Sequence, residues 1–364
     1  MAYKTLVAFT YFLAFATVIP LWRHSAWWVR GFDFPRLQFM IMAFVLLVAE
    51  IIFLDFSHYD TWIVTIIALA AFCFHGGWIL PFTRLFPVEV KISRHNDPKN
   101  KISILTANVL TTNQNYKGLL DLVAKHQPDV LVTLETDRWW EDKLRVLETD
   151  YTYTMKCPLD NKYGMHVYSR LALEDTAIQY LVEPDVPSMH ALVVLRSGVR
   201  VRVHFLHPAP PSPTENPASS ERDAELLVVA KSVSDEFSPI IVTGDLNDVA
   251  WSETTRLFRK ISGLLDPRIG RGMFNTFHAE FWFARWPLDH LFHSEHFTLA
   301  HIERLPYFGS DHFPMLVALV YDEPHGADQE GLVADEKDHE WAEQKMEEHA
   351  VEEADVHEPG KEKE

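Results

Sequence analysis

Three long apolar stretches in the first 82 residues constrain the fold of this chain more than any other feature. They run over Leu6–Trp22, Leu37–Leu54 and Trp62–Phe82, about 17 to 21 residues each. A helix needs about 20 apolar residues to cross a bilayer. The first stretch resembles a secretion signal, but it lacks a clear small-residue cleavage site and two similar stretches follow it. We therefore expect three transmembrane helices in residues 1–83 and an integral membrane protein that contacts the bilayer through residues 6–82.

Lysine and arginine residues flank these stretches unevenly. Only Lys4 precedes the first stretch, and none lies between the second and the third. Loops that are rich in lysine and arginine stay in the cytoplasm. We therefore expect an outer N-terminus, a cytoplasmic domain after Phe82 and a location in a bacterial inner membrane. Glu50, one turn from the end of the second stretch, is expected to snorkel to the interface. The remaining basic residues near the stretches are Arg23, Arg30, Arg36, Arg84, Lys91, Arg94, Lys99 and Lys101.

The net charge of -18 is concentrated at the C-terminus. Residues 322–364 hold 17 acidic residues and four lysines, and they contain few large apolar side chains. Such a composition predicts a solvated, disordered tail with some helix, or else a segment that binds a partner. The rest of the chain lacks the strongly basic balance of a dedicated duplex-DNA binder, and no obligate protein partner is evident. The two cysteines, Cys73 and Cys157, exclude a disulfide framework or a thiolate metal site.

Residues 101–321 alternate β-branched runs with amphipathic stretches, after a linker over residues 84–100. Several strands are joined by tight turns, which favours two mixed β-sheets packed together with helices outside, an α/β architecture. Expected helices are Tyr116–His126, Asp137–Asp150, Ser219–Glu236 and Ser252–Ile261. Expected strands are Lys101–Val109, Asp129–Glu135, His166–Arg170, His190–Ser197, Val199–His207, Pro239–Asn247, Leu288–Ser294 and Phe313–Val320.

Polar side chains stand at nearly every end of these predicted strands, where a hydrophobic core would not select them. Asn and Asp after a strand ordinarily make a turn, so any one of them has a structural explanation. Their number on a single domain instead indicates a functional site. The residues are Asn108, Glu135, His207, Asp245 and Asn247 at strand ends, Asp289 at a strand start, and Asp311 and His312 just before the last strand.

Charged residues in this set suit a metal-assisted reaction on an anionic substrate. Glu135 and Asp311 are carboxylates, which a hard cation prefers as ligands. His207 and His312 can donate hydrogen bonds to a phosphate or move protons near neutral pH. Asp289 could orient His312 as a carboxylate orients a catalytic imidazole.

The remaining three residues fit the same chemistry. Asn108 and Asn247 offer neutral donors and acceptors to a ligand oxygen, and Asp245 can position or deprotonate a water. Because side chains two apart in a strand share one face, Asp245 and Asn247 are expected to reach the same phosphate. The chain has no Gly-x-Ser-x-Gly motif and no reactive cysteine, so attack by water assisted by a metal ion is the expected reaction.

The motifs and their order resemble the endonuclease/exonuclease/phosphatase superfamily, which includes pancreatic deoxyribonuclease, abasic-site endonucleases, sphingomyelinases and inositol polyphosphate phosphatases. The similarity rests on TAN at a strand end, a Glu at the next strand end, H-P, GDLN, LDHLF and GSDHFP, and it spans Lys101–Val320. It implies a four-layer α/β sandwich, preceded here by three transmembrane helices, and Mg²⁺-dependent hydrolysis of phosphoesters, with Mn²⁺ as a possible substitute.

Carried over by position, the resemblance implies roles for single residues. Glu135 is similar to the metal carboxylate, with Asn108 and Asp311 nearby. Asp245 resembles the residue that activates water. The phosphate contacts implied are Asn108, Asn247, His207 and His312, with Asp289 as the partner of His312. Some members carry an acid two residues after the first Asn, where this chain has Leu110, and this departure weakens the case for a second metal.

Other interpretations stay open from the sequence. A substrate could be a nucleic acid, a phospholipid head group or a small phosphate ester, and a catalytically inactive membrane scaffold is the alternative function. His290, His293 and His296 could suggest zinc, although residues three apart on a strand face opposite ways. The aromatic segment Phe274–Leu288 could face substrate or membrane, or pack in the core.

Overall fold

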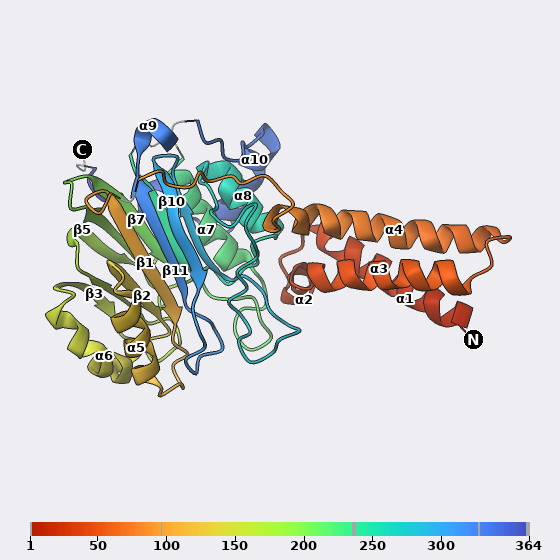
Figure 1. The fold of residues 1–364 in the computed structure, drawn as a ribbon, viewed down its shortest axis with the longest axis horizontal. Helices are drawn as coiled ribbons and strands as arrows, with labels where there is room; N and C mark the ends of the chain where they lie inside the picture. The colour runs from red at the N-terminus through yellow and green to blue at the C-terminus, as the bar shows by residue number, and fades with distance from the viewer. Residues whose placement is uncertain (1, 96, 235–237, 327, 362–364) are drawn as a thin grey trace. The chain divides into compact units, whose positions relative to one another are not determined.

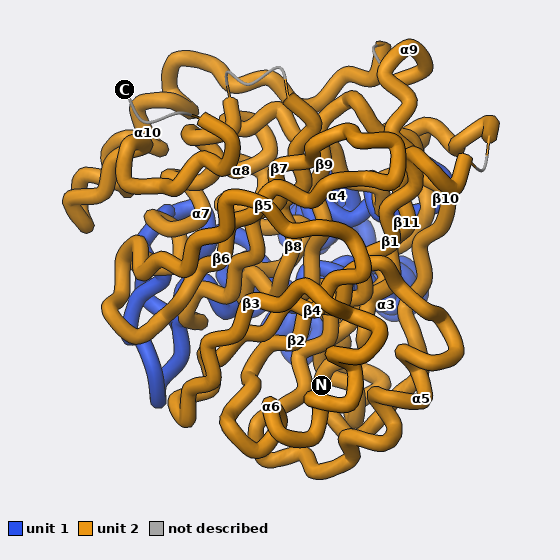
Figure 2. Tube along the Cα trace, turned by 90° about the vertical axis from the view of Figure 1, so that its left-hand side faces the viewer, with its two compact units in different colours: residues 1–87, 211–219 blue, residues 88–210, 220–364 orange. Residues whose placement is uncertain are grey.

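The computed structural model describes residues 2–95, 97–234, 238–326 and 328–361. The chain divides into two compact units, which Figure 2 shows in different colours. Unit 1 holds residues 1–87 and 211–219, and unit 2 holds residues 88–210 and 220–364. Nine residues of the loop between a strand and the following helix of unit 2, Pro211–Ser219, therefore belong to unit 1.

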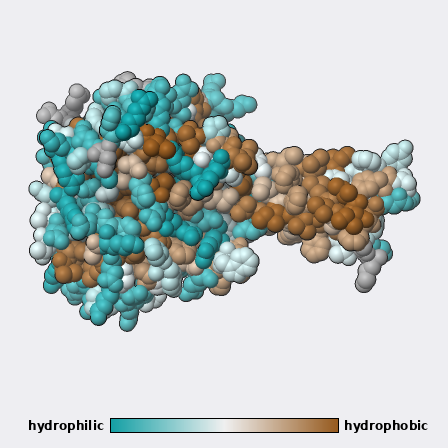
Figure 3. All heavy atoms as spheres, viewed as in Figure 1, coloured by the Kyte–Doolittle hydropathy of each residue, from teal (hydrophilic) through white to brown (hydrophobic). Residues whose placement is uncertain are grey.

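Unit 1 is built from three long helices, α1 (Ala2–Val18), α3 (Arg36–Phe53) and α4 (Tyr59–Ile79), and the single turn α2 (Trp27–Arg30). Each long helix, with its continuation, is long and apolar enough to cross a membrane, over Tyr3–Trp22, Arg36–Phe53 and Tyr59–Phe82. Large apolar side chains cover the outside of these helices (Figure 3). Lipid is the solvent that such a surface fits, and the three helices expected from the sequence are present and apolar enough to span a membrane.

Polar contacts join the helices of this unit, two of them buried inside it and one, Tyr3–Asp60, exposed. Three hydroxyl residues of α1, each seven positions from the next, meet ionisable residues of α3 and α4. Glu50 is fully buried and accepts a hydrogen bond of 2.7 Å from Thr10 Oγ1, so the expectation that it snorkels to the interface is wrong. Hydrogen bonds between helices stabilise helix association in an apolar medium. The pairs are Tyr3–Asp60, Thr10–Glu50 and Thr17–His75.

Unit 2 contains two mixed β-sheets (Figure 1). Only the pairs β1–β2 and β7–β8 are parallel, and the other pairs are antiparallel. The first sheet has the order β10 (Phe297–Arg304), β11 (Met315–Tyr321), β1 (Lys101–Asn108), β2 (Val130–Leu134), β4 (Met165–Ser169), β3 (Tyr153–Cys157). The second has the order β5 (Ala172–Gln179), β6 (Ser188–Val194), β7 (Arg200–Leu206), β8 (Ile240–Asp245), β9 (Asp289–His293).

Helices cover the outer face of each sheet. On the first sheet, α5 (Tyr116–His126) and α6 (Arg138–Leu144) pack through residues such as Leu119 and Trp140. On the second, α7 (Ser220–Ser232), α8 (Glu253–Ser262) and α10 (Glu336–Glu347) share one hydrophobic cluster with β8 and β9. A third cluster, contributed by both sheets, fills the space between them. These layers confirm the predicted four-layer α/β sandwich.

The predicted elements are found, and three strands were missed. β5 and β10 lie at sheet edges with several exposed polar residues, and β3 is a short edge strand. An edge strand buries too few residues to show a clear apolar period. The last predicted residues of helix Ser219–Glu236, 235 and 236, lie outside the described residues.

The segment before β1 is held against unit 2 rather than extending as a free linker. Glu89 pairs with the buried Arg259 at 2.5 Å, and Ile92 forms a parallel bridge with Leu299. The Lys91 backbone N–H donates to the side chain of Gln329 at 2.6 Å. Unit 2 accordingly begins at Val88.

The described part of the acidic C-terminal segment, residues 322–326 and 328–361, contains two helices and buried apolar residues, which corrects the prediction of a disordered tail. Residues 323–326 form α9, and residues 336–347 form α10, whose N-terminus is capped by Asp335. Four apolar residues of the segment are buried in the hydrophobic cluster that includes α7 and α8. The sequence prediction missed them because it considered only the average composition of the segment. Residues 327 and 362–364 lie outside the described residues. The four buried residues are Ala342, Met346, Val351 and Val356.

Buried histidines predict that acid destabilises unit 2. His190 and His204 face each other through their Nδ1 atoms at 2.8 Å on neighbouring strands. Burial lowers the pKa of His190 to about 3 and that of His204 well below its ordinary value. A lowered histidine pKa stabilises the fold above the unfolded pKa of 6.5, and this contribution is lost as pH falls toward the folded pKa. Burial also lowers the pKa of His166, His207, His290 and His293.

We expect the free energy of unfolding of the full chain in detergent to fall between pH 6.5 and pH 4, by about 1.4 kcal/mol per pH unit for each proton taken up. A double variant, His190→Gln with His204→Gln, should show a shallower pH slope in urea unfolding. His339→Gln, at an exposed position of α10, should keep the wild-type slope. An unchanged slope in the double variant would mean that the pair does not resist protonation.

Candidate functional site

The topology of the two sheets gathers the predicted site residues at one edge. β1, β2, β7 and β8 run in two parallel pairs, so the carboxyl ends of each pair lie at the same edge. β11 and β9 are antiparallel to β1 and β8, so their starting residues lie at that edge too. A hydrogen-bond distance of 3.2 Å between Thr106 Oγ1 and Thr243 Oγ1 joins the two sheets just inside it.

Asn108 stands at the centre of this edge and connects the two sheets. Its side-chain amide donates to Glu135 Oε1 at 3.0 Å and to Asp245 Oδ2 at 3.2 Å. Asn108 and Asp245 are almost fully buried. The side-chain oxygen of Asn108 accepts from the Leu110 backbone N–H at 3.0 Å, which fixes the amide's orientation. One amide group, that of Asn108, therefore donates hydrogen bonds to two carboxylates from different sheets.

His312 lies between two carboxylates. Its Nδ1 is 2.8 Å from Asp289 Oδ2, and its Nε2 is 3.4 Å from Asp245 Oδ2. Burial alone would lower the pKa of His312, but the charges of Asp245 and Asp289 outweigh it and raise the pKa to about 10. The two carboxylates thus favour the protonated imidazole, and the Asp289 contact with Nδ1 fits the orienting role expected from the sequence.

Glu135 and Asp311 form the acidic side of the site. Burial, opposed by the Asn108 hydrogen bond and aided by the charge of Asp311, raises the pKa of Glu135 to about 7. Glu135 follows β2 in the left-handed conformation, with φ at 58°, and the Thr111 hydroxyl donates to its carbonyl at 2.9 Å. Such a cost in backbone energy is typical of a functional position. A buried carboxyl with a second carboxylate nearby fits a cation, which would favour the ionised form.

His207 and Asn247 complete the set. Burial lowers the pKa of His207 to about 4, while the charge of Asp245 raises it and that of His312 lowers it. Asn247 lies beyond the end of β8 with φ at 51°. Its backbone N–H donates to Asp245 Oδ1 at 3.0 Å, and its side chain donates to the Pro208 carbonyl at 3.0 Å. Asp245 and Asn247 are therefore brought together by a turn after β8. The sequence pattern predicts that they share one face of a strand, but β8 ends at Asp245.

Two glycines permit close backbone approaches at this edge. A Cβ at Gly244 would collide with the carbonyl of Leu206 on the neighbouring strand, and its φ of 151° suits glycine. A Cβ at Gly164 would collide with the carbonyl of Thr136, directly after Glu135. Any larger residue at either position would displace a strand end that carries a site residue.

Two groups of side chains within the described residues could hold a metal ion. Asp245, Asp289 and His312 offer ligand atoms within 4.8 Å of one another. The other group is the set predicted from sequence, Glu135 and Asp311 with Asn108. Both ring nitrogens of His312 already face carboxylates, Nδ1 at 2.8 Å from Asp289 and Nε2 at 3.4 Å from Asp245. Glu135 and Asp311 offer the carboxylate oxygens that a hard cation prefers, so this second group is the one expected to bind Mg²⁺.

All eight residues singled out from the sequence meet at this edge through the contacts and charges described above. Sequence reasoning missed residues that support them. Ser310 Oγ donates to the Asn108 carbonyl at 2.8 Å, and the His312 backbone N–H donates to Ser310 Oγ at 3.1 Å. The Tyr163 ring lies 5.6 Å from the ring of His207. In the sequence, Ser310 directly precedes Asp311 and Tyr163 directly precedes Gly164, and this adjacency was the only indication of their supporting roles.

The histidines considered for zinc have other partners. His290 lies 2.7 Å from Arg268 and 2.9 Å from the Asp248 carbonyl. His293 Nδ1 lies 2.8 Å from the Ser294 carbonyl, and His296 Nδ1 lies 2.9 Å from Ser294 Oγ. The aromatic segment is exposed at Phe281, Trp282 and Phe283, partly buried at Phe274 and buried at Leu288.

Comparisons with known proteins give one family and several structures of similar fold. Residues 105–312 match the sequence model of the Endonuclease/Exonuclease/phosphatase family. The human nocturnin catalytic domain with bound sulfate is 17% identical with a TM-score of 0.50, over 62% of this chain and 96% of that one. No curated protein matches the chain.

Two further solved structures are similar. D. rerio TDP2, complexed with a single-strand DNA product, is 18% identical with a TM-score of 0.49, over 60% of this chain and 98% of that one. A mannosyl-6-phosphatase of Bacteroides thetaiotaomicron is 17% identical with a TM-score of 0.47, over 60% of this chain and 100% of that one.

The two candidate metal groups can be separated by substitution. Glu135→Gln should weaken Mn²⁺ binding to the full chain at least about tenfold, because it removes a charged ligand from a hard-cation site. Asp289→Asn should leave the affinity within about threefold, because it alters only the surroundings of His312. Isothermal titration calorimetry with Mn²⁺ measures both. The reverse pattern would place the ion at Asp245, Asp289 and His312.

Proposed function

The chain belongs to the endonuclease/exonuclease/phosphatase family, and from this membership we propose that it is a membrane-anchored, metal-dependent phosphoester hydrolase. One observation carries the proposal: a single buried network joins Asn108, Glu135, Asp245, His312 and Asp289 across two sheets. The core of a stable domain has no use for three carboxylates and an imidazolium in contact, because burying charge costs free energy.

The residues divide the reaction among them. Glu135 and Asp311, with Asn108, hold Mg²⁺ or Mn²⁺. When bound, this ion supplies Lewis-acid stabilisation of the negative charge that develops on the phosphate oxygens. All three residues belong to the first sheet or to the loops next to its strands, so the proposed metal site lies on the first-sheet side of the active site.

Asp245 accepts a proton from the attacking water, whose oxygen bonds to phosphorus as the P–O bond to the leaving group breaks. Burial raises the pKa of Asp245, and the charge of His312 lowers it. The charge of His312 thus opposes, in part, the effect of burial on this base. His312 also faces the phosphate as a cation.

Neutral and oriented groups complete the phosphate site. Asn247 has one side-chain N–H beyond the one that bonds the Pro208 carbonyl, and it donates this to a phosphate oxygen. Asn108 contacts the phosphate by exchanging one of its bonds to Glu135 and Asp245 for it. His207, neutral because of its lowered pKa, contacts the same group. Asp289 holds His312 in place. The substrate class is a nucleic acid, a phospholipid head group or a small phosphate ester, and the assay below separates these.

For the rest of the chain, we propose that residues 1–83 anchor the protein and residues 101–321 form the catalytic domain. The segment 84–100 joins them, and residues 322–361 belong to the catalytic unit as a folded extension. The proposed location is a bacterial inner membrane, and the lysine and arginine flanks support an orientation with the catalytic domain in the cytoplasm.

Asp245→Asn and His312→Ala should each lower kcat about 10²- to 10⁴-fold, the range expected for loss of an acid–base group. The full chain in detergent is assayed with Mg²⁺, and with chelator, on plasmid DNA, single-stranded RNA, phospholipid vesicles and inositol phosphates. The exposed Asp160→Asn is the matched control and should keep full activity. Normal turnover in both site variants would refute the site, and wild-type inactivity on every substrate would favour the inactive scaffold.

A reporter enzyme fused after Phe82 tests the topology. We expect an alkaline phosphatase fusion to be inactive and a green fluorescent protein fusion to be bright, because both report a cytoplasmic position. The same fusions after Asp55, in the loop without lysine or arginine, should give the opposite pair of signals. Alkaline phosphatase activity at the Phe82 junction would overturn the orientation.

A further inference from the structure

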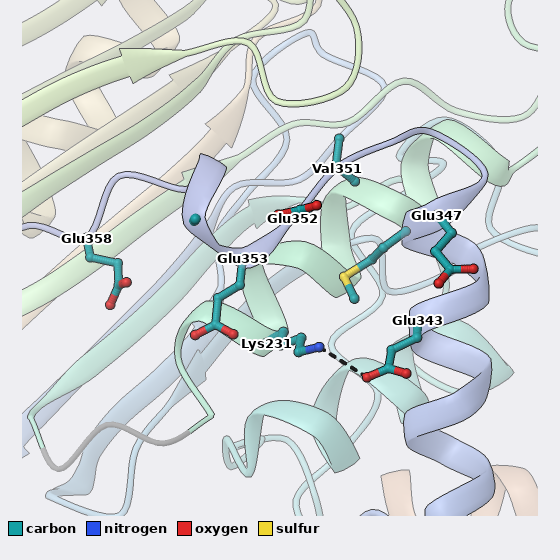
Figure 4. Close-up of a pocket in the computed structure, with 9 residues that line it drawn as sticks. Lys231, Glu343, Glu347, Val351, Glu352, Glu353 and Glu358 are labelled. Atoms are coloured by element: carbon teal, nitrogen blue, oxygen red, sulfur yellow. Dashed lines mark hydrogen bonds and ion pairs between the residues drawn. The ribbon is translucent and has the colours of Figure 1, made fainter.

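The C-terminal segment of unit 2 packs on α7 outside the region that matches the family. α10 begins 24 residues after the last matched residue, His312. Figure 4 shows α10 beside α7, where Lys231 pairs with Glu343 at 3.3 Å, next to a pocket lined mainly by glutamates. This exposed pair fastens the outer side of the helix. On its inner side, α10 makes a different kind of contact.

Lys345 is the buried charge of α10. Its Nζ lies 2.6 Å from Asp223 Oδ2, and the side chains of Lys345 and Asp223 are 9% and 1% exposed. The charges of Lys345 and Arg222 lower the pKa of Asp223 despite its burial. A lysine buried on an acidic segment is unusual, since exposed sites for its charge are plentiful there.

Asp223 also accepts hydrogen bonds from Arg222, the preceding residue of α7. Asp223 Oδ1 accepts from Arg222 Nη2 at 2.7 Å and from Nε at 3.1 Å. Arg222 Nη1 in turn donates to the backbone carbonyl of Asn247 at 2.8 Å and lies 3.4 Å from Asp248 Oδ1. The guanidinium is 1% exposed, so these bonds are not shared with bulk water.

Asn247 is the residue through which this chain of contacts reaches the proposed catalytic groups. Its left-handed backbone, with φ at 51°, needs support from its surroundings. It bonds Asp245 through its backbone N–H and the Pro208 carbonyl, next to His207, through its side chain. Arg222 holds the carbonyl of this same residue.

We propose that Lys345 is a positioning residue for the active-site turn over residues 245–248. Lys345 and Arg222 balance the charges of Asp223 and Asp248. Without Lys345, two buried carboxylates compete for one guanidinium, and Arg222 moves from the Asn247 carbonyl toward them. The turn then loses its support, and Asp245 and Asn247 lose their alignment.

The experiment compares Lys345→Met, Lys345→Arg and the exposed control Lys337→Met in the full chain in detergent. Hydrogen–deuterium exchange followed by mass spectrometry reports on peptides covering residues 244–252, with β1 as reference. Hydrolysis of bis(4-nitrophenyl) phosphate with Mg²⁺ gives kcat and KM, and this half rests on the proposed function.

For Lys345→Met we expect faster exchange in residues 244–252 with unchanged exchange in β1. We also expect a kcat about tenfold lower with KM within about twofold, since misplaced reacting groups reduce turnover more than binding. Lys345→Arg should restore both, and Lys337→Met should match the wild type.

Wild-type exchange in residues 244–252 of Lys345→Met would overturn the proposal. Equal acceleration in every peptide, without restoration by Lys345→Arg, would also overturn it, since α10 would then stabilise the whole unit without directing this turn. A wild-type protein that does not hydrolyse the diester contradicts the proposed function alone, because exchange in residues 244–252 still decides the role of Lys345.

Discussion

Parallel pairing of β1 with β2 and of β7 with β8 is the constraint on which the rest of unit 2 depends. Each pair brings two carboxyl ends to one edge, and the antiparallel neighbours β11 and β9 bring their starts to the same edge. Packing the sheets face to face then sets Asn108 and Asp245 within 3.2 Å of each other. The site is therefore a property of strand direction, and each polar residue needs only to stand at the end of its strand.

Much of this arrangement could be predicted from the sequence because it depends on local patterns. Buried strand β8 begins as an apolar β-branched run, β1 is rich in isoleucine and leucine, and helix α5 carries a clear amphipathic period. The polar residues at their ends break those runs and so stand out. The order of the motifs then supplied the site residues, which the two sheets bring together.

Other features depend on contacts between segments far apart in sequence, and no local pattern predicts them. The acidic average of residues 322–364 concealed the spacing of Ala342 and Met346, which place one face of α10 on α7. Glu50 was expected at the interface because its partner, Thr10, lies 40 positions away. Asn247 was assigned to a strand that ends at Asp245, because turn geometry depends on the Pro208 carbonyl and on Arg222.

Charge balance connects these observations. Four carboxylates, Glu135, Asp245, Asp289 and Asp311, stand at one edge with a single imidazolium among the site residues, so the edge is acidic before any ligand arrives. A divalent cation would offset that excess, and a phosphate would follow the cation. Behind the edge, Lys345, Asp223, Arg222 and Asp248 form a second buried group whose charges cancel. A neutral support can fix a turn without altering the field at the site, which explains why two basic residues stand behind an edge that must itself remain acidic.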